Sequence, residues 1–255
     1  MWAQRSRDTL LGLCPIVLLI GLWHGIAVSG MAPPSLLPLP ATVFWRLVQQ
    51  VQSPTFLGHA GITLVRLFSG FLLALVIGVS IGLFAAVNRQ LGAMMRPIVR
   101  VLAPVPKVAL YPAFILVLGF DSAPKVALVL VDALFPILLA TYFGALAVEP
   151  KLVWSARAAG ASPLKCVFTV ILPAALPSIL TGCRIGLVIS CIVVFLAEMI
   201  TSTDGLGHLL VRASRSFQTV DMFVPLISIS VLGLLLNAGL NLLRQRLLAG
   251  FPAEN

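Results

Sequence analysis

Six long apolar runs constrain this chain more than any other feature of its sequence. A helix needs about 20 apolar residues to cross the hydrocarbon core of a bilayer, and each run approaches or exceeds that length. Strands of a membrane barrel would instead alternate over about ten residues. The chain is 60% hydrophobic and only 10% charged, whereas soluble chains carry about 25% charged residues. We therefore expect an all-α integral membrane protein with spans at residues 10–28, 60–87, 98–119, 126–147, 174–200 and 223–243.

The placement of basic residues predicts the orientation of these spans. The net charge is +9, but the basic residues are scattered rather than clustered, which argues against a nucleic-acid partner. Basic residues concentrate in cytoplasmic segments of membrane proteins. This predicts that both termini and the connection between the fourth and fifth spans are cytoplasmic. The predicted cytoplasmic segments hold Arg5, Arg7, Arg89, Arg96, Lys151, Arg157, Lys165, Arg244 and Arg246, and the opposite segments hold Arg46, Lys125, Arg212 and Arg215.

The first span has an alternative interpretation, because basic residues, an apolar run and the small residues Ala27 and Ser29 could form a cleavable signal peptide. The apolar region of a signal peptide is only about 7–15 residues long, so we favour a retained helix. After it, residues 42–51 predict a short interfacial helix with Trp45 at headgroup level. In the second span, Gly78 and Gly82 predict close packing against another helix.

The sequence lacks the patterns of a nucleotide or metal site. It has no Gly-x-x-x-x-Gly-Lys-Ser/Thr phosphate loop and no His-Glu-x-x-His motif. The cysteines show no paired spacing of the Cys-x-x-Cys kind, so we interpret them as small apolar fillers. We predict no catalytic residue, no metal and no cofactor bound by this chain, so an energy source must come from a gradient or a partner. The cysteines are Cys14, Cys166, Cys183 and Cys191.

The connection between the fourth and fifth spans contains two helix signals. Pro150 suits the first turn of a helix and Gly160 its C-terminal end, where a left-handed residue is often needed. Ser162 and Pro163 then suit the start of a second helix. A plain turn between bundled helices takes about 2–8 residues, whereas this connection spends about 25. We therefore expect a sharp corner whose small residues let another protein approach the backbone closely.

The same stretch resembles the cytoplasmic signature of binding-protein-dependent ABC importer permeases, Glu-Ala-Ala, three residues, Gly, nine residues, Ile, one residue, Leu-Pro. Gly160 is followed by nine residues, then Val170 in the isoleucine position and Leu172-Pro173. Trp154-Ser155-Ala156 replaces Glu-Ala-Ala, which removes one carboxylate. The resemblance assigns ATPase docking to Ser155, Ala156, Arg157, Ala158, Ala159, Gly160, Ala161, Ser162, Leu172 and Pro173.

Further ordered matches extend the resemblance over roughly residues 55–247, most closely to the nitrate, sulfonate and taurine group. They include Pro106-Lys107-Val108-Ala109-Leu110-Tyr111-Pro112, Gly119-Phe120-Asp121-Ser122-Ala123-Pro124-Lys125, Phe135-Pro136-Ile137, Leu172-Pro173-Ala174-Ala175-Leu176-Pro177-Ser178-Ile179, Ala197-Glu198-Met199-Ile200 and Gly205-Leu206-Gly207.

The resemblance implies a six-helix, type I, MetI-like permease fold in a bacterial inner membrane. It implies a second copy of the chain, two cytoplasmic ATPase subunits that hold ATP and Mg, and a periplasmic solute-binding protein. We accordingly divide the chain into an N-terminal helix with a periplasmic segment (1–59), a core permease domain (60–247) with the docking loop at about 148–173, and a cytoplasmic tail (248–255).

Residues of the translocation path are predicted from charges and broken backbone. Pro104 and Pro106 remove helical hydrogen bonds, and irregular backbone at membrane depth is tolerated where it lines protein or a wet cavity. Lys107 alternatively lies near the cytoplasmic edge and extends outward. Arg184 either meets an anionic solute or forms a structural pair with Asp132 or Glu198. The path candidates are Pro106, Lys107, Tyr111, Asp132, Arg184 and Glu198.

Two other classes of function are less well supported. A gradient-driven carrier would need midplane coupling groups and often an inverted repeat, and a membrane-embedded enzyme would need a convergent catalytic constellation. Neither pattern is present. The solute stays open between an anion, such as a sulfonate, taurine or nitrate, and a neutral or cationic molecule such as a vitamin precursor.

Overall fold

The computed structural model describes residues 2–33, 35–102 and 104–249. The last six residues of the tail predicted at 248–255 lie outside this part of the chain. Within it the regular structure is entirely helical. The helices are α1 (Trp2–Val28), α2 (Pro40–Val51), α3 (Pro54–Val87), α4 (Arg89–Leu102), η1 (Lys107–Leu110), α5 (Tyr111–Leu118), α6 (Ser122–Leu146), α7 (Pro150–Ala158), α8 (Pro163–Cys166), η2 (Val167–Ile171), α9 (Leu172–Thr201), α10 (Leu206–Arg215) and α11 (Thr219–Leu247).

Four of the predicted spans are helices long and apolar enough to cross a membrane. They are α3, α6, the continuous helix Pro163–Thr201 and α11. The first predicted span lies within α1, which contains the shorter apolar stretch Cys14–Val28. These helices agree with the prediction of an all-α membrane protein, and only the third span differs in kind.

The prediction of one span at residues 98–119 is wrong. The chain there forms three pieces, α4, η1 and α5, and the break follows Leu102. Pro104 and Pro106 lie in the break and have no N–H to donate, so a helix cannot pass through them with its ladder intact. The third predicted span is therefore replaced by short helices joined by irregular backbone.

The core consists of α3, α6 and α9, with α6 between the other two helices. Small residues let the backbones of these helices approach one another, as we predicted from Gly78 and Gly82. At Gly82 an added Cβ would lie 2.8 Å from the Leu138 carbonyl oxygen and 2.8 Å from Thr141 Cβ, both on α6. At Gly182 on α9 it would lie 2.6 Å from Ala140 Cβ. Glycine is therefore required on both sides of α6.

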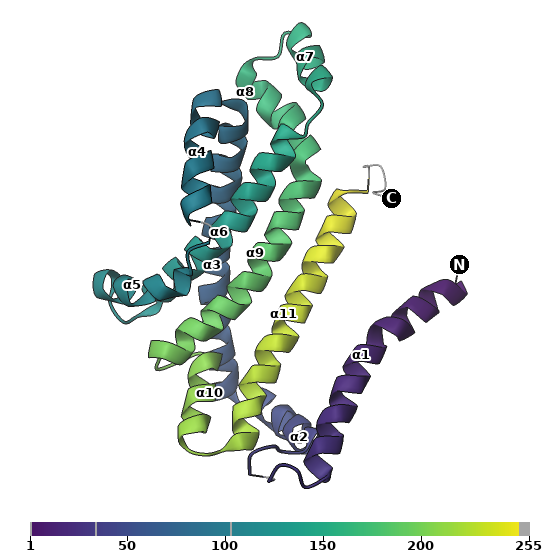
Figure 1. Cartoon of the computed structure of the whole chain (residues 1–255), viewed down its shortest axis with the longest axis vertical. Helices are drawn as coiled ribbons and strands as arrows, with labels where there is room; N and C mark the ends of the chain where they lie inside the picture. Colours follow the sequence, from purple (N-terminus) through teal and green to yellow (C-terminus); the bar gives the residue numbers. More distant parts are fainter. Residues whose placement is uncertain (1, 34, 103, 250–255) are drawn as a thin grey trace.

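Figure 1 shows the two ends of the molecule. The short helices α7 and α8 lie at one end, called the α7 end below, and α2 and α10 lie at the other, called the α10 end. Helix α1 diverges from the core, and its N-terminus and the C-terminus of α11 both point toward the α7 end. The helix predicted at residues 42–51 is α2, on which Trp45 is 64% exposed. Arg46 of α2 binds Asp221 of α11 with an N–O distance of 2.6 Å, which fixes α2 against the bundle.

Candidate functional site

The corner after α7 has the geometry that its sequence predicted. Pro150 occupies the first turn of α7, and Gly160 has φ +85°, in the left-handed region that glycine adopts without strain. The Ala161 N–H donates to the Ala156 carbonyl (3.0 Å), which closes the end of the helix in the manner of a Schellman motif. The Ser162 hydroxyl accepts from the Lys165 N–H (3.3 Å), which caps α8.

Most of the predicted docking residues are exposed at this corner. They project from the α7 end of the molecule (Figure 1), and Ala156 and Ala161 are only half-buried. A cavity of about 540 Å³ lies between α7, α8 and the junction of α3 with α4, and Arg89 and Arg157 line it. The corner is therefore a protruding element with a small-residue face and a hollow beside it.

The second helix of the corner is not a separate element, which corrects the prediction of two short helices. Helix α8 continues through the π-helical turn η2 into α9, so the fifth span begins at Pro163 rather than at residue 174. Pro173 has no N–H, and the widened turn comes directly before it, where a helical hydrogen bond would be missing. Leu172 and Pro173 consequently lie in the first turn of α9, beyond the exposed corner.

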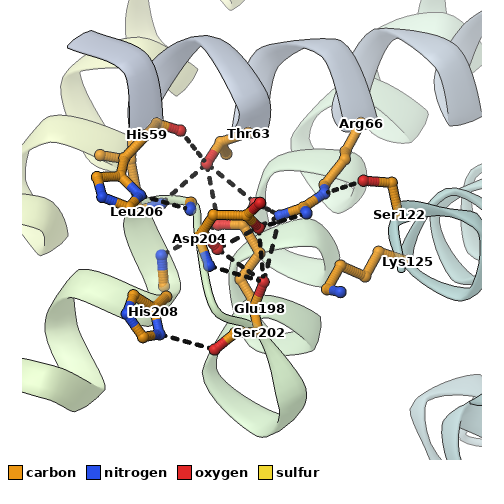
Figure 2. Close-up of polar contacts among 12 residues, drawn as sticks. His59, Thr63, Arg66, Ser122, Lys125, Glu198, Ser202, Asp204, Leu206 and His208 are labelled. Carbon is orange, nitrogen blue, oxygen red and sulfur yellow. Dashed lines mark hydrogen bonds and ion pairs between the residues drawn. The ribbon is translucent and has the colours of Figure 1, made fainter. Parts of the chain in front are cut away.

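A buried polar network joins α3, α6, α9 and the loop before α10 at the α10 end (Figure 2). Arg66 of α3, 2% exposed, is its centre. Its guanidinium donates to Glu198 Oε1 (2.9 Å), to the Asp204 carboxylate and to the Ser122 hydroxyl (3.0 Å). Lys125 of α6 lies nearby and donates to the carbonyls of Phe120 and Asp121 (3.2 and 2.9 Å). Two helices and a loop are thus bound to one side chain of α3.

Glu198 is fixed within this network. It is 1% exposed, and it accepts from Arg66, from the Thr63 hydroxyl (2.9 Å to Oε2) and from the Gly207 N–H (3.1 Å). These contacts hold the side chain in place, and its assignment to the translocation path stays a prediction. Sequence analysis missed Arg66, although a lone arginine inside an apolar helix is costly and signals a buried partner.

The loop from Ser202 to Gly207 depends on its glycines. Gly205 has φ +94°, and a Cβ there would overlap the Glu198 carboxylate. The loop backbone donates to α3: the Gly205 N–H to His59 Nδ1 (3.0 Å) and the Leu206 N–H to the Thr63 hydroxyl (2.9 Å). These contacts explain why the Gly205-Leu206-Gly207 motif follows a glutamate on α9.

Among the charged side chains of this network, Asp204 is the most exposed: it lies in the loop between α9 and α10, and its side chain is 36% exposed. Burial acts to raise the pKa of its carboxyl, but the hydrogen bond and charge of Arg66, the Ser202 hydroxyl and the charge of Lys125 together lower it below its ordinary value. The carboxylate is therefore stabilised in its charged form.

Among the other path candidates, Lys107 and Asp132 form an ion pair with an N–O distance of 3.8 Å. The Lys107 ammonium lies 4.8 Å from the ring centroid of Phe135 on α6, and its side chain is 11% exposed. The alternative in which Lys107 extends outward is wrong, because α6 holds the charge. Tyr111 is fully buried, and its hydroxyl shares a hydrogen bond with Thr201 of α9 (3.0 Å).

Arg184 does not form the predicted pair with Asp132 or Glu198. It is exposed on α9, and its Nε donates to Asn237 Oδ1 of α11 (3.0 Å). Glu198 is about four turns further along α9 and is occupied by Arg66, while Asp132 is occupied by Lys107. The structural-pair interpretation is therefore corrected, and Arg184 lies on the side of α9 that faces α11.

Cysteines and carboxylates do not assemble a metal site in the described part of the chain. Cys166, Cys183 and Cys191 are buried and free, in keeping with their interpretation as small apolar fillers, whereas Cys14 is exposed.

Comparison with known proteins gives consistent matches. Residues 78–249 match the family described as binding-protein-dependent transport system inner membrane component. The putative aliphatic sulfonates transport permease protein SsuC of Bacillus subtilis (strain 168) is 33% identical over 96% of this chain and 89% of its own length. The taurine transport system permease protein TauC of Escherichia coli (strain K12) is 28% identical over 95% of this chain and 90% of its own. The formylaminopyrimidine transport permease protein ThiX of Halalkalibacterium halodurans is 28% identical over 96% and 97%.

A solved structure matches the fold. A chain of the MetNI methionine ABC transporter in an inward-facing conformation superimposes with a TM-score of 0.64, at 21% identity, over 73% of this chain and 93% of that one. The MetI-like arrangement predicted from sequence is thereby confirmed. With its family match over residues 78–249, the chain belongs to the binding-protein-dependent transport system inner membrane components, as a multi-pass, non-enzymatic permease subunit of an ABC importer whose ATPase is a separate subunit.

Proposed function

We propose that two copies of this chain form the membrane part of an importer that takes a small organic sulfonate, such as an alkanesulfonate or taurine, from a periplasmic binding protein into the cytoplasm. The similarity to permeases named for aliphatic sulfonates and taurine supports this solute class. A second candidate is a neutral or cationic vitamin precursor, favoured by the similarity to a permease named for formylaminopyrimidine. ATP and Mg would be held by the two partner ATPases.

The exposed corner after α7 carries the proposal. Its small residues leave the backbone accessible, and Gly160 turns the chain without a side chain at the tip. Beyond its two chain neighbours, no atom of the described residues lies within 4 Å of the position of a Gly160 Cβ, so packing within this part of the chain does not require glycine there for space. We assign ATPase docking to residues 155–162, with Leu172 and Pro173 transmitting the contact into α9.

The same assignment gives the orientation. The α7 end would lie in the cytoplasm, with both termini, and the α10 end would face the binding protein. The basic residues of the connections at the α7 end support this orientation. For the translocation path we retain the ion pair of Lys107 and Asp132 and the exposed Arg184, because these groups place charge on or next to the core helices. Pro106 and Tyr111, which are close to Lys107 in the sequence, are retained with them.

Gly160 variants test the docking assignment. Gly160→Val should impose about 1–2 kcal/mol of left-handed backbone strain and place a branched side chain at the contact. We expect the variant to insert and dimerise but to lose its ATPase during purification. Gly160→Asn is the control, since asparagine tolerates the left-handed conformation.

The readouts are the ATPase retained on the purified permease and the mass of the intact complex, which should contain two permease chains. Retention of the ATPase by Gly160→Val at the wild-type level would refute the docking assignment. A second, different permease chain in the complex would refute the homodimer.

A further inference from the structure

Cations at the α10 end fall into two groups. Arg46 is paired with Asp221, Arg66 with Glu198 and Asp204, and Lys125 donates to backbone carbonyls. Arg212 and Arg215, in the last turn of α10, are exposed and form no ion pair with any residue that the structure describes. No carboxylate of the described residues therefore compensates the charge of these two guanidinium groups.

Both arginines line one cavity of about 500 Å³ between α10, the end of α9 and Phe120. Hydroxyl groups of Thr203 and Ser216 also line it, as does His208, whose Nδ1 donates to the Ser202 carbonyl (2.7 Å). That hydrogen bond fixes the ring, and Nε2 has no hydrogen-bond partner among the described residues. Apolar side chains, among them Met199 and Val211, complete the wall. The cavity size falls within the range of about 300–1,000 Å³ typical of small-molecule sites.

Glu198 also borders the cavity, but it does not make the site acidic. Its carboxylate is fully buried and accepts from Arg66, Thr63 and the Gly207 backbone. Asp204 is likewise bound by Arg66. The polar network described above thus neutralises the nearby carboxylates and leaves the cavity with two unpaired positive charges.

We propose that this cavity is an oxyanion site that receives the sulfonate group of a small organic solute at the mouth of the transporter. Guanidinium groups bind oxyanions through charge-assisted, often bidentate hydrogen bonds. The hydroxyl groups supply further donors, and the apolar wall accommodates a short alkyl chain. This inference rests on the orientation and solute class proposed above, and it assigns this chain its own selectivity for anions before the solute enters the membrane.

Charge-selective labelling tests the proposal on the purified permease–ATPase complex. Ser216→Cys, in a background with Cys14→Ser, is treated with a methanethiosulfonate reagent bearing an ethylsulfonate and with its trimethylammonium counterpart. Rates are divided by those at Ser29→Cys, which lies outside the cavity. We expect the anionic reagent to be favoured by about fivefold, as two nearby positive charges would produce after screening by salt. Millimolar ethanesulfonate should slow labelling, whereas neutral dimethyl sulfone should not.

Arginine variants separate charge from structure. Arg212→Gln with Arg215→Gln should bring the ratio to about one and abolish protection by ethanesulfonate, whereas Arg212→Lys with Arg215→Lys should keep the preference. An unchanged ratio in the glutamine pair, or no protection in the parent, would overturn the proposal. Protection by solute-free binding protein but not by ethanesulfonate would also overturn it, since the arginines would then form a docking surface. ATP-dependent uptake in proteoliposomes is measured separately, so that failure of the proposed function is distinguished from failure of this site.

Discussion

Buried charges in the core helices are stabilised by particular side chains, and Arg66 is the most important of these. It forms ion pairs with both Glu198 and Asp204, which come from different elements, and it is almost fully buried. A buried charge without a partner is far more costly than a paired one. Arg66 therefore holds the α10 end together by satisfying groups that α9 and its following loop cannot satisfy themselves.

Arg66→Met should lower the free energy of unfolding by about 3–5 kcal/mol, because it leaves a carboxylate buried and unpaired. Arg46→Met is the matched control, since the Arg46 side chain is 44% exposed in its pair with Asp221 and exposed pairs contribute about 0–1 kcal/mol. Thermal unfolding of the detergent-solubilised variants provides the comparison. Equal midpoints for the two variants would show that the Arg66 network is not stabilising.

Asp204 should make part of this stability depend on pH. Its folded pKa lies below the ordinary value, so its contribution is fully present above the unfolded pKa of about 3.9 and is lost as the pH falls through the folded pKa. Asp204→Asn should therefore lower the unfolding midpoint at pH 7 and pH 5 alike, and the difference from wild type should shrink below about pH 4. Glu149→Gln, on a side chain that is 60% exposed, serves as control and should change little. A difference that grows on acidification would contradict the assignment.

Predictions about single residues succeeded where the conformation of a residue depends on others close to it in the sequence. The left-handed Gly160 and the Ser162 cap each depend on a few neighbouring residues, which the sequence displays. The partner of Glu198 lies 132 residues away on another helix, and the alternatives that we weighed paired Glu198 and Asp132 with Arg184. Only the packing of α3 against α9 identifies Arg66 as that partner.

Whole helices show a similar division. The lengths of α3, α6 and α11 follow from continuous apolar runs. The start of α9 was not predicted correctly, because Pro163 and Pro173 each look like the beginning of a helix. The π-helical turn between them makes the helix continuous. The break of the third segment was visible as two prolines, but the fold of its pieces depends on contacts such as that of Tyr111 with Thr201.

The packing of α3 against α6 gives a test on one helix. Gly82→Ala should destabilise the protein by about 1–3 kcal/mol, because the new Cβ meets the α6 backbone. At Gly58 on the same helix, an added Cβ would have no atom of another described element within 4 Å, so Gly58→Ala should be neutral or stabilising by up to about 1 kcal/mol. Thermal unfolding of both variants measures the contrast. Similar midpoints would mean that the two helices are not in close contact in the membrane.

For the molecule as a whole, the orientation is the most direct prediction. In a background with Cys14→Ser, a cysteine at Gly160 should react with an impermeant thiol reagent only from the cytoplasmic side. A cysteine at Phe217, which is 94% exposed near the α10 end, should react only from the outside. Labelling of right-side-out and inside-out vesicles decides between the two orientations, and the reverse pattern would refute ours.

The polar network around Arg66 also has a mechanical consequence. It fixes α3, α6 and α9 to one another at the α10 end, so any relative tilt of these helices must pivot close to Glu198. Glu198 lies 26 positions (198 − 172) beyond Leu172 on α9, a rise of about 40 Å, so a tilt of about 10° would displace the far end of the helix by about 7 Å. Because the α7 corner continues directly into that end through α8 and η2, a force applied there would act on α9 with its full length as the lever arm.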